Sequence, residues 1–327
     1  MQDYVLSVRA VRNGAFVADV GPSKFLVVPP DQETPTAAHA ITQAAWYKLV
    51  RTAAAWQNDR GEPRGDLLFI VHGYNLSVKE VIERHRRLKA DLLVLGFKGV
   101  IASFDWPSDD KTLAYLPDRH RAKETAFRLV SDGIAYLSAE QTPSCNINIH
   151  VLGHSTGAYV IREAFNDADD MELRNLSWNV SQVLFAAGDI SAASLATGNS
   201  ETESLYRHSI RFTNYSSRYD RALDLSNVKR LGTAPRVGRV GLPHNAPSKA
   251  VNVDCTAYYE TLAADANSSI AAPLDQPNGF MGLQSHSWYF GNLTFTHDLF
   301  GVLIGEDRTV ILSRQVLPDG RIALKKP

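Results

Sequence analysis

Residues 147 to 157 read Ile-Asn-Ile-His-Val-Leu-Gly-His-Ser-Thr-Gly, an alternating apolar run that ends in Gly-x-Ser-x-Gly around Ser155. A serine on a sharp turn between a strand and a helix can act as a nucleophile, because the turn exposes its hydroxyl at the end of the sheet. Glycines at positions 153 and 157 permit the turn, since Cβ atoms there would meet neighbouring backbone. We therefore expect acyl-transfer chemistry at Ser155.

The surroundings of this pentapeptide strengthen the prediction. Average glycine and serine usage produces the pattern by chance in roughly one chain of this length in ten. Apolar residues precede it at strand spacing and follow it at helical spacing, namely Ile147, Ile149 and Val151 before it, and Ala158, Ile161, Ala164 and Phe165 after it. This is the strand-turn-helix setting that a nucleophile elbow requires.

A serine nucleophile needs an acid that orients its base, and two aspartates fit by position. On a doubly wound hydrolase sheet the acid follows the nucleophile at the end of a later strand. Asp220 follows the expected strand 210–213 by a short loop, and Asp189 follows the expected strand 183–187. We favour Asp220 and keep Asp189 as the alternative. Either carboxylate could instead have a structural role, in an ion pair or a helix cap.

The base should be a histidine downstream of the acid. His286 lies after the last strand-like run and before the final expected helix, where the loop of the base belongs. His297 comes at an expected helix start and suits a surface or capping role. His244 lies beside a proline in an irregular stretch and is a weaker reserve. We therefore expect a triad of Ser155, Asp220 and His286.

The oxyanion formed in acyl transfer needs two backbone N–H donors. Thr156 directly follows the nucleophile and is one candidate. Tyr74 is the other, because Gly73 ends an earlier strand and lets the backbone turn close to the substrate without a Cβ. His72 precedes the serine in the chain, so we expect it to make a structural hydrogen bond rather than act as the base.

Three further residues are candidates for contact with substrate. Asp105 and Trp106 end the expected strand 100–104, and ligands of α/β sheets bind at that edge. Trp288 lies two residues after the candidate base. The alternative for each is a packing role, with the tryptophans in the core and Asp105 bonded to local backbone.

Length, composition and charge limit the kinds of protein that this chain can be. A chain of 327 residues with 44% hydrophobic residues can form one large α/β domain with a substantial core. The formal net charge of −1 gives no field that favours nucleic acid or an anionic membrane, so a neutral small-molecule substrate fits best. Cys145 and Cys255 form neither a disulfide framework nor a metal motif. The N-terminus lacks an apolar leader, and we expect a cytoplasmic protein without membrane insertion.

Alternating residues 4–11 and 16–28 predict an antiparallel opening of the sheet. Parallel strands then alternate with helices. The expected strands are 67–71, 100–104, 147–152, 183–187 and 210–213. The expected helices are 36–56, 77–93, 120–137, 158–168 and 296–303, and Ser77 and Glu80 are spaced as a capping box.

Two segments depart from this alternation. Residues 225–280 are rich in glycine and proline, with one β-like run at 250–254, and predict an irregular insertion that could be a lid or a binding loop. Residues 308–327 predict a closing hairpin around Pro318-Asp319-Gly320. We expect a single domain over residues 1–327.

Five ordered motifs resemble a bacterial branch of the alpha/beta hydrolase superfamily whose members are largely hydrolases of unknown function. They are Phe-Ile-Val-His-Gly-Tyr-Asn at 69–75, Ser-Phe-Asp-Trp-Pro-Ser at 103–108, Gly-His-Ser-Thr-Gly at 153–157, Ala-Ala-Gly-Asp-Ile at 186–190 and His-Ser-Trp-Tyr-Phe at 286–290. The resemblance covers about residues 65–305 and leaves out residues 1–60 and the C-terminal hairpin. It implies the same triad, with Tyr74 and Thr156 as oxyanion donors. Members often read Ala-Pro-Asp where this chain has Ala187-Gly188-Asp189, which weakens any role for Asp189.

The sequence thus predicts an alpha/beta-hydrolase fold with a serine hydrolase site that cleaves carboxylic esters through an acyl-enzyme. This chemistry needs no metal or organic cofactor. An amidase, thioesterase or acyltransferase would use the same triad, and a non-catalytic scaffold of the same fold is the alternative outside enzymes. The sequence leaves the oligomeric state open.

Overall fold

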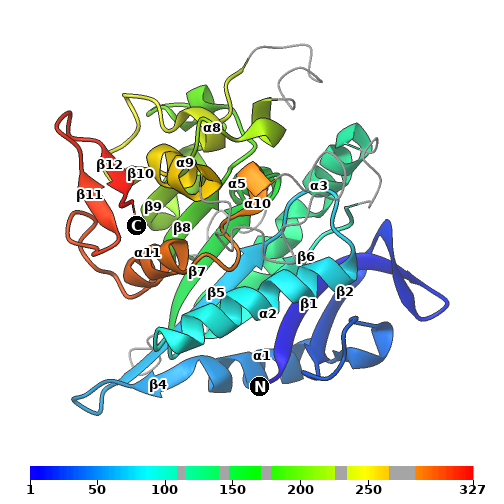
Figure 1. Ribbon diagram of the computed structural model, residues 1–327. Coiled ribbons are helices and arrows are strands. Elements are labelled where there is room, and N and C mark those ends of the chain that lie inside the picture. Colours follow the sequence, from blue (N-terminus) through cyan, green and yellow to red (C-terminus); the bar gives the residue numbers. More distant parts are fainter. Residues whose placement is uncertain (109–114, 140–146, 171–177, 225–233, 265–283, 327) are drawn as a thin grey trace.

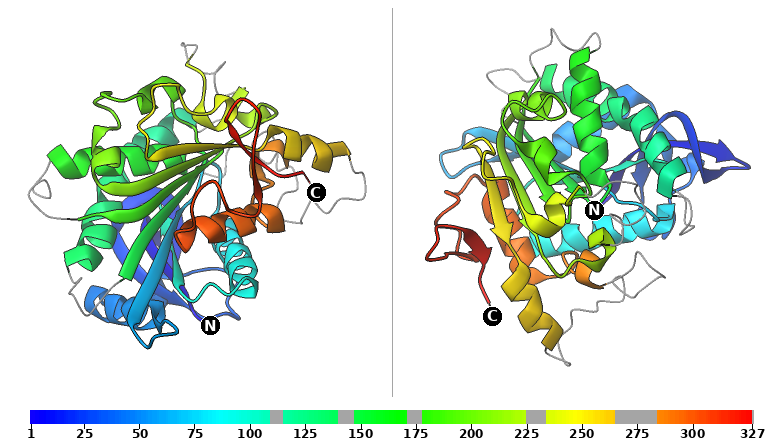
Figure 2. Two further views of the ribbon diagram at one scale, coloured as in Figure 1. Left: turned by 90° about the vertical axis from the view of Figure 1, so that its left-hand side faces the viewer. Right: turned by 90° about the horizontal axis from the view of Figure 1, so that it is seen from above.

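The computed structural model describes residues 1–108, 115–139, 147–170, 178–224, 234–264 and 284–326. Within these residues, twelve strands form one mostly parallel mixed sheet with helices on both faces (Figures 1 and 2), as the sequence predicts. The strands are β1 (Asp3–Arg12), β2 (Ala15–Val28), β3 (Ala40–Ile41), β4 (Ala55–Gln57), β5 (Pro63–Val71), β6 (Val100–Asp105), β7 (Ile147–His154), β8 (Val180–Ala186), β9 (Ser209–Ser216), β10 (Ala250–Asp254), β11 (Arg314–Val316) and β12 (Ile322–Leu324).

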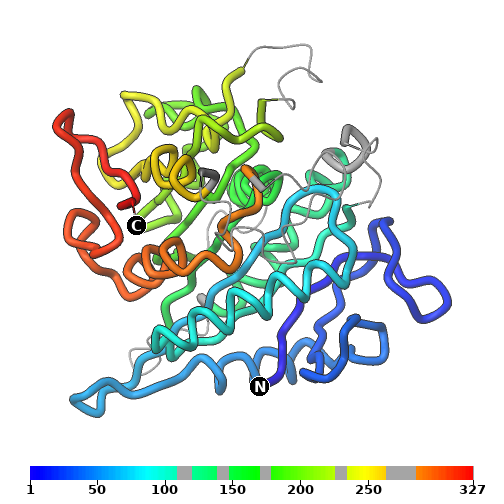
Figure 3. Tube along the Cα trace, in the orientation of Figure 1, coloured from blue at the N-terminus to red at the C-terminus, as the bar shows by residue number. Residues whose placement is uncertain are grey.

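The strand order is β11-β12-β10-β9-β8-β7-β5-β6-β1-β2-β3, with β4 pairing to the start of β5. Strands β5 to β10 run parallel to one another, and β1 joins them in parallel against β6, whereas β4 is antiparallel to β5. The N-terminal hairpin β1-β2 and the C-terminal hairpin β11-β12 are antiparallel, which confirms both predicted hairpins. Figure 3 shows them on opposite sides of the molecule, blue and red.

Alternate side chains of the central strands pack into two hydrophobic cores, one on each face of the sheet. In β5, Leu67, Phe69 and Val71 pack with α1, α3 and α5, whereas Leu68 and Ile70 pack with α2, α9 and α11. Because both faces are covered, the central strands are continuous apolar runs rather than alternating ones. The helices are α1 (Gln43–Ala54), α2 (Val78–Val94), α3 (Tyr115–Leu129), α4 (Ala135–Ala139), α5 (Gly157–Asp170), α6 (Glu203–Arg207), α8 (Val237–Val240), α9 (Thr256–Ala264), α10 (Gln284–Ser287) and α11 (Leu293–Leu303).

Local signals set most helix starts. Ser77 and Glu80 form the predicted capping box at the start of α2. Helix α1 begins later than predicted because Thr42 caps it, after a short 3-10 turn and strand β3. The predicted helix 120–137 is a longer unit, α3 and α4, joined by the π-helical segment Val130–Ile134.

The segment predicted to be irregular contains a strand of the main sheet. Strand β10 pairs in parallel with β9 and β12, and α8 and α9 flank it. Residues 225–233 and 265–283 lie outside the described residues, so the predicted lid or binding loop stays a prediction. None of the helices in the described ranges is both long and apolar enough to cross a membrane.

A buried ion pair fastens the C-terminal hairpin to the rest of the protein. Arg314 donates two hydrogen bonds to the Asp298 carboxylate of α11, at 2.6 and 2.8 Å, and both side chains are essentially unexposed. The Tyr215 hydroxyl of β9 donates to the same carboxylate at 2.7 Å. Strand β9, helix α11 and the hairpin therefore share one charge-assisted network.

We predict that Arg314→Met lowers the free energy of unfolding by about 3–5 kcal/mol, because it leaves the Asp298 carboxylate buried without its counter-charge. Urea unfolding monitored by tryptophan fluorescence measures this loss. Arg321→Met is the matched control, since Arg321 pairs with Asp319 on the same hairpin while 62% exposed, and it should change stability by less than about 0.5 kcal/mol. Equal losses in the two variants would contradict the prediction.

Candidate active site

Ser155 occupies a sharp turn between β7 and α5. Its φ of 55° lies in the left-handed region that non-glycine residues rarely adopt. A Cβ on Gly157 would stand 2.1 Å from the Val71 carbonyl oxygen, and one on Gly153 would stand 2.7 Å from the Ile161 side chain. Both positions therefore exclude a side chain, as the sequence predicts.

Backbone strain collects at one edge of the sheet. Four described non-glycine residues have positive φ, and three of them follow adjacent strands: Asn75 after β5, Ser155 after β7 and Ala187 after β8, with φ of 60°, 55° and 50°. The fourth, Asn13, lies in the turn of the N-terminal hairpin. Strained conformations persist where the surroundings over-determine them and cluster at functional sites. The carboxyl edge of β5, β7 and β8 is therefore the candidate site.

The candidate base and acid are in direct contact. His286, on α10, has its Nδ1 2.8 Å from Asp220 Oδ2, and both side chains are buried. The second carboxylate oxygen, Oδ1, accepts the Leu223 N–H at 2.9 Å. These contacts orient the imidazole with Nδ1 toward the carboxylate and leave Nε2 as its reactive nitrogen.

The two atoms that would exchange a proton in catalysis have no partner within the described residues. Ser155 Oγ and His286 Nε2 are both buried without a hydrogen bond. Buried polar groups are nearly always paired, so such exceptions require an explanation. In enzymes, hydrogen bonds between catalytic groups are often long in the absence of substrate.

His154 connects the end of β7 to helix α10, which carries His286. The sequence analysis did not single out this residue. Its Nε2 lies 2.9 Å from the His286 carbonyl oxygen, and the two imidazole centroids are 4.8 Å apart. Burial lowers the pKa of His154 well below its usual value, and the proximity of His286 lowers it further. A neutral His154 has one N–H, which the His286 carbonyl accepts. The available signal was its place in the motif, next to Ser155.

The alternative candidates for the acid and the base, Asp189, His244 and His297, have different surroundings. The Asp189 N–H donates to the Ser155 carbonyl at 3.0 Å, but the Asp189 carboxylate lies 3.3 Å from the Arg236 guanidinium, and both side chains are buried. His244 and His297 are exposed. The structure thus brings together Asp220 and His286, and gives Asp189 a cationic partner.

The candidate oxyanion donors flank the nucleophile. A Cβ on Gly73 would stand 2.8 Å from Ser155 Cβ, so the loop after β5 lies directly against the nucleophile. Tyr74 and Thr156 are both buried, and Thr156 Oγ1 has no partner among the described residues. Their backbone donor roles, and a substrate contact at Gly73, stay predictions.

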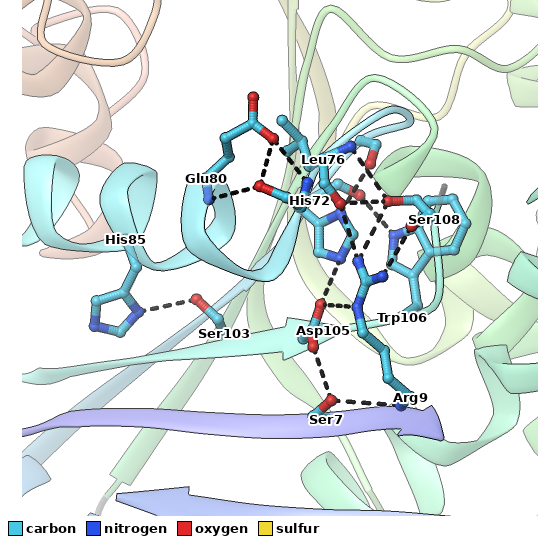
Figure 4. A network of polar contacts seen from close by, with 12 residues as sticks. Ser7, Arg9, His72, Leu76, Glu80, His85, Ser103, Asp105, Trp106 and Ser108 are labelled. Atoms are coloured by element: carbon cyan, nitrogen blue, oxygen red, sulfur yellow. Dashed lines mark hydrogen bonds and ion pairs between the residues drawn. The ribbon is translucent and has the colours of Figure 1, made fainter. Parts of the chain in front are cut away.

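Asp105 and Trp106 take part in a buried network (Figure 4). Asp105 accepts hydrogen bonds from Arg9 Nε and Ser7 Oγ, each at 2.7 Å, and lies 3.3 Å from His72 Nε2. Trp106 stacks on the His72 ring and donates its indole N–H to the His72 carbonyl at 2.8 Å. These contacts favour the packing role over the predicted contact with substrate, and they give His72 the structural role that the sequence predicts.

Trp288 is also in a packing environment. It is 1% exposed and stacks on Tyr289 with ring centroids 4.3 Å apart. Tyr258 and Phe295 pack around it in the same core. Its predicted contact with substrate has no support from this position.

A cavity of about 430 Å³ lies away from this edge. It is lined by α1 and by the amino ends of β5 and β7, with Tyr47, Lys48 and Arg51 among its residues. Because the nucleophile follows the carboxyl end of β7, this cavity is not part of the candidate site.

The family model described as "Alpha/beta hydrolase of unknown function (DUF900)" matches residues 51–253, more than half of the chain. The match begins and ends earlier than the predicted range 65–305, so Ser155 and Asp220 lie inside it and His286 lies outside. No curated protein matches this chain.

Solved structures with similar folds include two hydrolases. A hyperthermophilic esterase from the archaeon Pyrobaculum calidifontis is 14% identical over 65% of this chain and 81% of its own, with a TM-score of 0.31. A dienelactone hydrolase from Anabaena variabilis is 14% identical over 78% of this chain and 88% of its own, with a TM-score of 0.34. Such low TM-scores add no weight to the family match.

The Asp105 network predicts an acid-dependent loss of stability. Burial raises the pKa of Asp105, but Arg9 and His72 outweigh burial and hold it at about 2, against 3.8 for the free side chain. Because the folded-state pKa is depressed, the stabilisation is complete above about pH 4 and is lost as the pH falls towards 2. It amounts to about 2 kcal/mol.

Urea unfolding at several pH values tests this dependence. Asp105→Asn should be less stable than the wild type at neutral pH and should lose about 2 kcal/mol less between pH 4 and pH 2. Asp19→Asn is the control, because Asp19 forms an exposed pair with Arg12, and its curve should follow the wild type. Parallel curves for Asp105→Asn and the wild type would contradict the assignment.

Proposed function

The chain belongs to a family of alpha/beta hydrolases of unknown function, and we propose that it is a serine hydrolase that cleaves carboxylic esters through an acyl-enzyme. The observation that carries the proposal is the 2.8 Å contact of Asp220 with His286, combined with the strained elbow of Ser155 at the same edge of the sheet. Ser155 follows β7 and Asp220 follows β9, and the chain order of serine, aspartate and histidine is the one that this chemistry uses on this fold.

The proposed reaction begins when Ser155 Oγ attacks the ester carbonyl carbon and His286 Nε2 takes the hydroxyl proton. Asp220 Oδ2 accepts a hydrogen bond from the Nδ1–H of His286 and, while remaining ionised, stabilises the imidazolium that forms. The N–H groups of Thr156 and Tyr74 bind the oxyanion. His286 then protonates the leaving alcohol, and water, activated by the same His286, releases the acid and restores Ser155.

Support for a dedicated nucleophile comes from the unpaired atoms of the site. Ser155 Oγ and His286 Nε2 are buried yet have no partner among the described residues. These are the two atoms between which acyl transfer at this site would move a proton. Amides and thioesters react by the same steps, so the ester is proposed as the simplest substrate of this chemistry.

We predict that Ser155→Ala lowers turnover of p-nitrophenyl esters by a factor on the order of 10⁴ to 10⁶ and abolishes labelling by a fluorophosphonate probe, because both require the Oγ nucleophile. Ser181→Ala is the control, since Ser181 lies at the amino end of β8, far along the strand from the site. If the folded wild-type protein is not labelled by the probe and does not hydrolyse esters, the proposal of an enzyme is rejected and the non-catalytic scaffold remains.

A pair of acid variants tests the assignment of Asp220. Asp220→Asn should lower kcat about 10⁴-fold, because an amide no longer holds the imidazole in the reactive tautomer. Asp189→Asn should keep kcat per folded molecule and mainly lower stability, since it removes the carboxylate that faces buried Arg236. Kinetics normalised by active-site titration, beside thermal unfolding, separate the two effects. The reverse pattern would make Asp189 the acid.

A further inference from the structure

Arg9 is a buried arginine in the middle of β1, outside the range that the family model matches. It is only 2% exposed, and its charge is balanced by Asp105 at 2.7 Å. Burial of a guanidinium is costly, even when it is paired. The ion pair with Asp105 uses only the Nε side of the guanidinium, but Arg9 also donates hydrogen bonds from both Nη nitrogens.

The remaining nitrogens of Arg9 hold two backbone segments at the carboxyl edge of the sheet. Nη1 donates to the Ser108 carbonyl at 2.8 Å, and Nη2 donates to the Leu76 carbonyl at 3.1 Å. The Ser108 hydroxyl donates to the same Leu76 carbonyl at 3.0 Å. Figure 4 shows the guanidinium between these two segments and Asp105.

Leu76 ends the loop that begins at His72 and contains Gly73, Tyr74 and Asn75. At its start, the His72 carbonyl accepts the Trp106 indole N–H, and the His72 ring stacks on Trp106. The loop that lies against Ser155 is therefore held at both ends, at Leu76 by Arg9 and at His72 by Trp106, which directly follows Asp105, the ion-pair partner of Arg9.

This loop is strained and needs such support. Asn75 has a φ of 60°, and the neighbouring Gly73 packs against Ser155 Cβ. A non-glycine residue stays in the left-handed region only where its surroundings hold it. Donors of an oxyanion hole stabilise the transition state only when they are oriented in advance.

We propose that Arg9 is a positioning residue for the candidate oxyanion loop, residues 72–76, so that this one side chain of the N-terminal hairpin supports the catalytic site. The inference rests on the proposed function, with Tyr74 as an oxyanion donor. Arg9 does not touch substrate. It acts through the Leu76 carbonyl and through Asp105, which together set the path of residues 72–76.

The test uses Arg9→Lys and Arg9→Met in the full chain, with Arg12→Met as the matched control. Arg12 lies three residues along the same strand, but its side chain is 70% exposed and pairs with Asp19. Arg9→Lys keeps the charge beside Asp105 yet cannot donate through a planar fork to two carbonyls. It therefore remains informative if Arg9→Met fails to fold.

For Arg9→Lys we expect kcat on p-nitrophenyl esters to fall about 10²- to 10³-fold, the loss typical of one oxyanion donor, with little change in KM. Affinity for an arylboronic acid, which places an oxyanion in the hole, should fall by a similar factor. Arg12→Met should match the wild type in both. These readouts separate positioning from general destabilisation, which would lower the melting temperature without a selective loss of boronate affinity.

Wild-type kcat and boronate affinity in a folded Arg9→Lys variant would overturn the inference, even with a lowered melting temperature. Failure of the proposed function is a separate result: the wild type itself would then show no fluorophosphonate labelling that depends on Ser155. A labelled wild type together with a fully active Arg9→Lys variant rejects the positioning role alone.

Discussion

The backbone of the elbow and the backbone that follows β5 approach each other more closely than side chains allow. Gly157 faces the Val71 carbonyl, and Gly73 faces Ser155 Cβ. The register supports this contact, because Val71 pairs with Gly153 where β5 and β7 end together. The candidate nucleophile and the candidate oxyanion loop are therefore neighbours because their main chains pack closely together. Few changes of side chain could alter this distance.

The other parts of the site are held to this contact by hydrogen bonds from distant segments. Asp220 follows β9 and fixes the imidazole of His286, while His154 holds the carbonyl of the same residue. His286 is therefore attached both to Asp220 and to strand β7, which leads into Ser155.

Features that depend on local chemistry could be predicted from the sequence. The glycines of the elbow, the capping box at Ser77 and both terminal hairpins are encoded within a few residues, and the structure contains each of them. Strand β10 was seen only as a β-like run, because its place in the sheet depends on pairing with β9 and β12.

Contacts between distant residues outside the recognised motifs could not be predicted. Arg9 lies about one hundred residues before its partners Asp105 and Ser108, and sequence spacing alone gives no sign of that contact. A charged residue at a buried position of an apolar strand was the available signal. The interactions of Asp189 with Arg236 and of Asp105 with Arg9 likewise became visible only once the fold had brought these side chains together.

The burial of Arg9 also has a consequence for the newly synthesised chain. Strand β1 can pair with β2 as soon as both leave the ribosome, but its other edge waits for β6, 98 residues further along at the Ser7–Asp105 contact. At about 5–20 residues per second, that edge stays open for roughly 5–20 s. Apolar open edges recruit other chains, and an inward-pointing charge discourages such pairing. Until Asp105 is made, Arg9 is an unpaired inward-facing charge on that edge, the kind of residue that disfavours pairing with another chain.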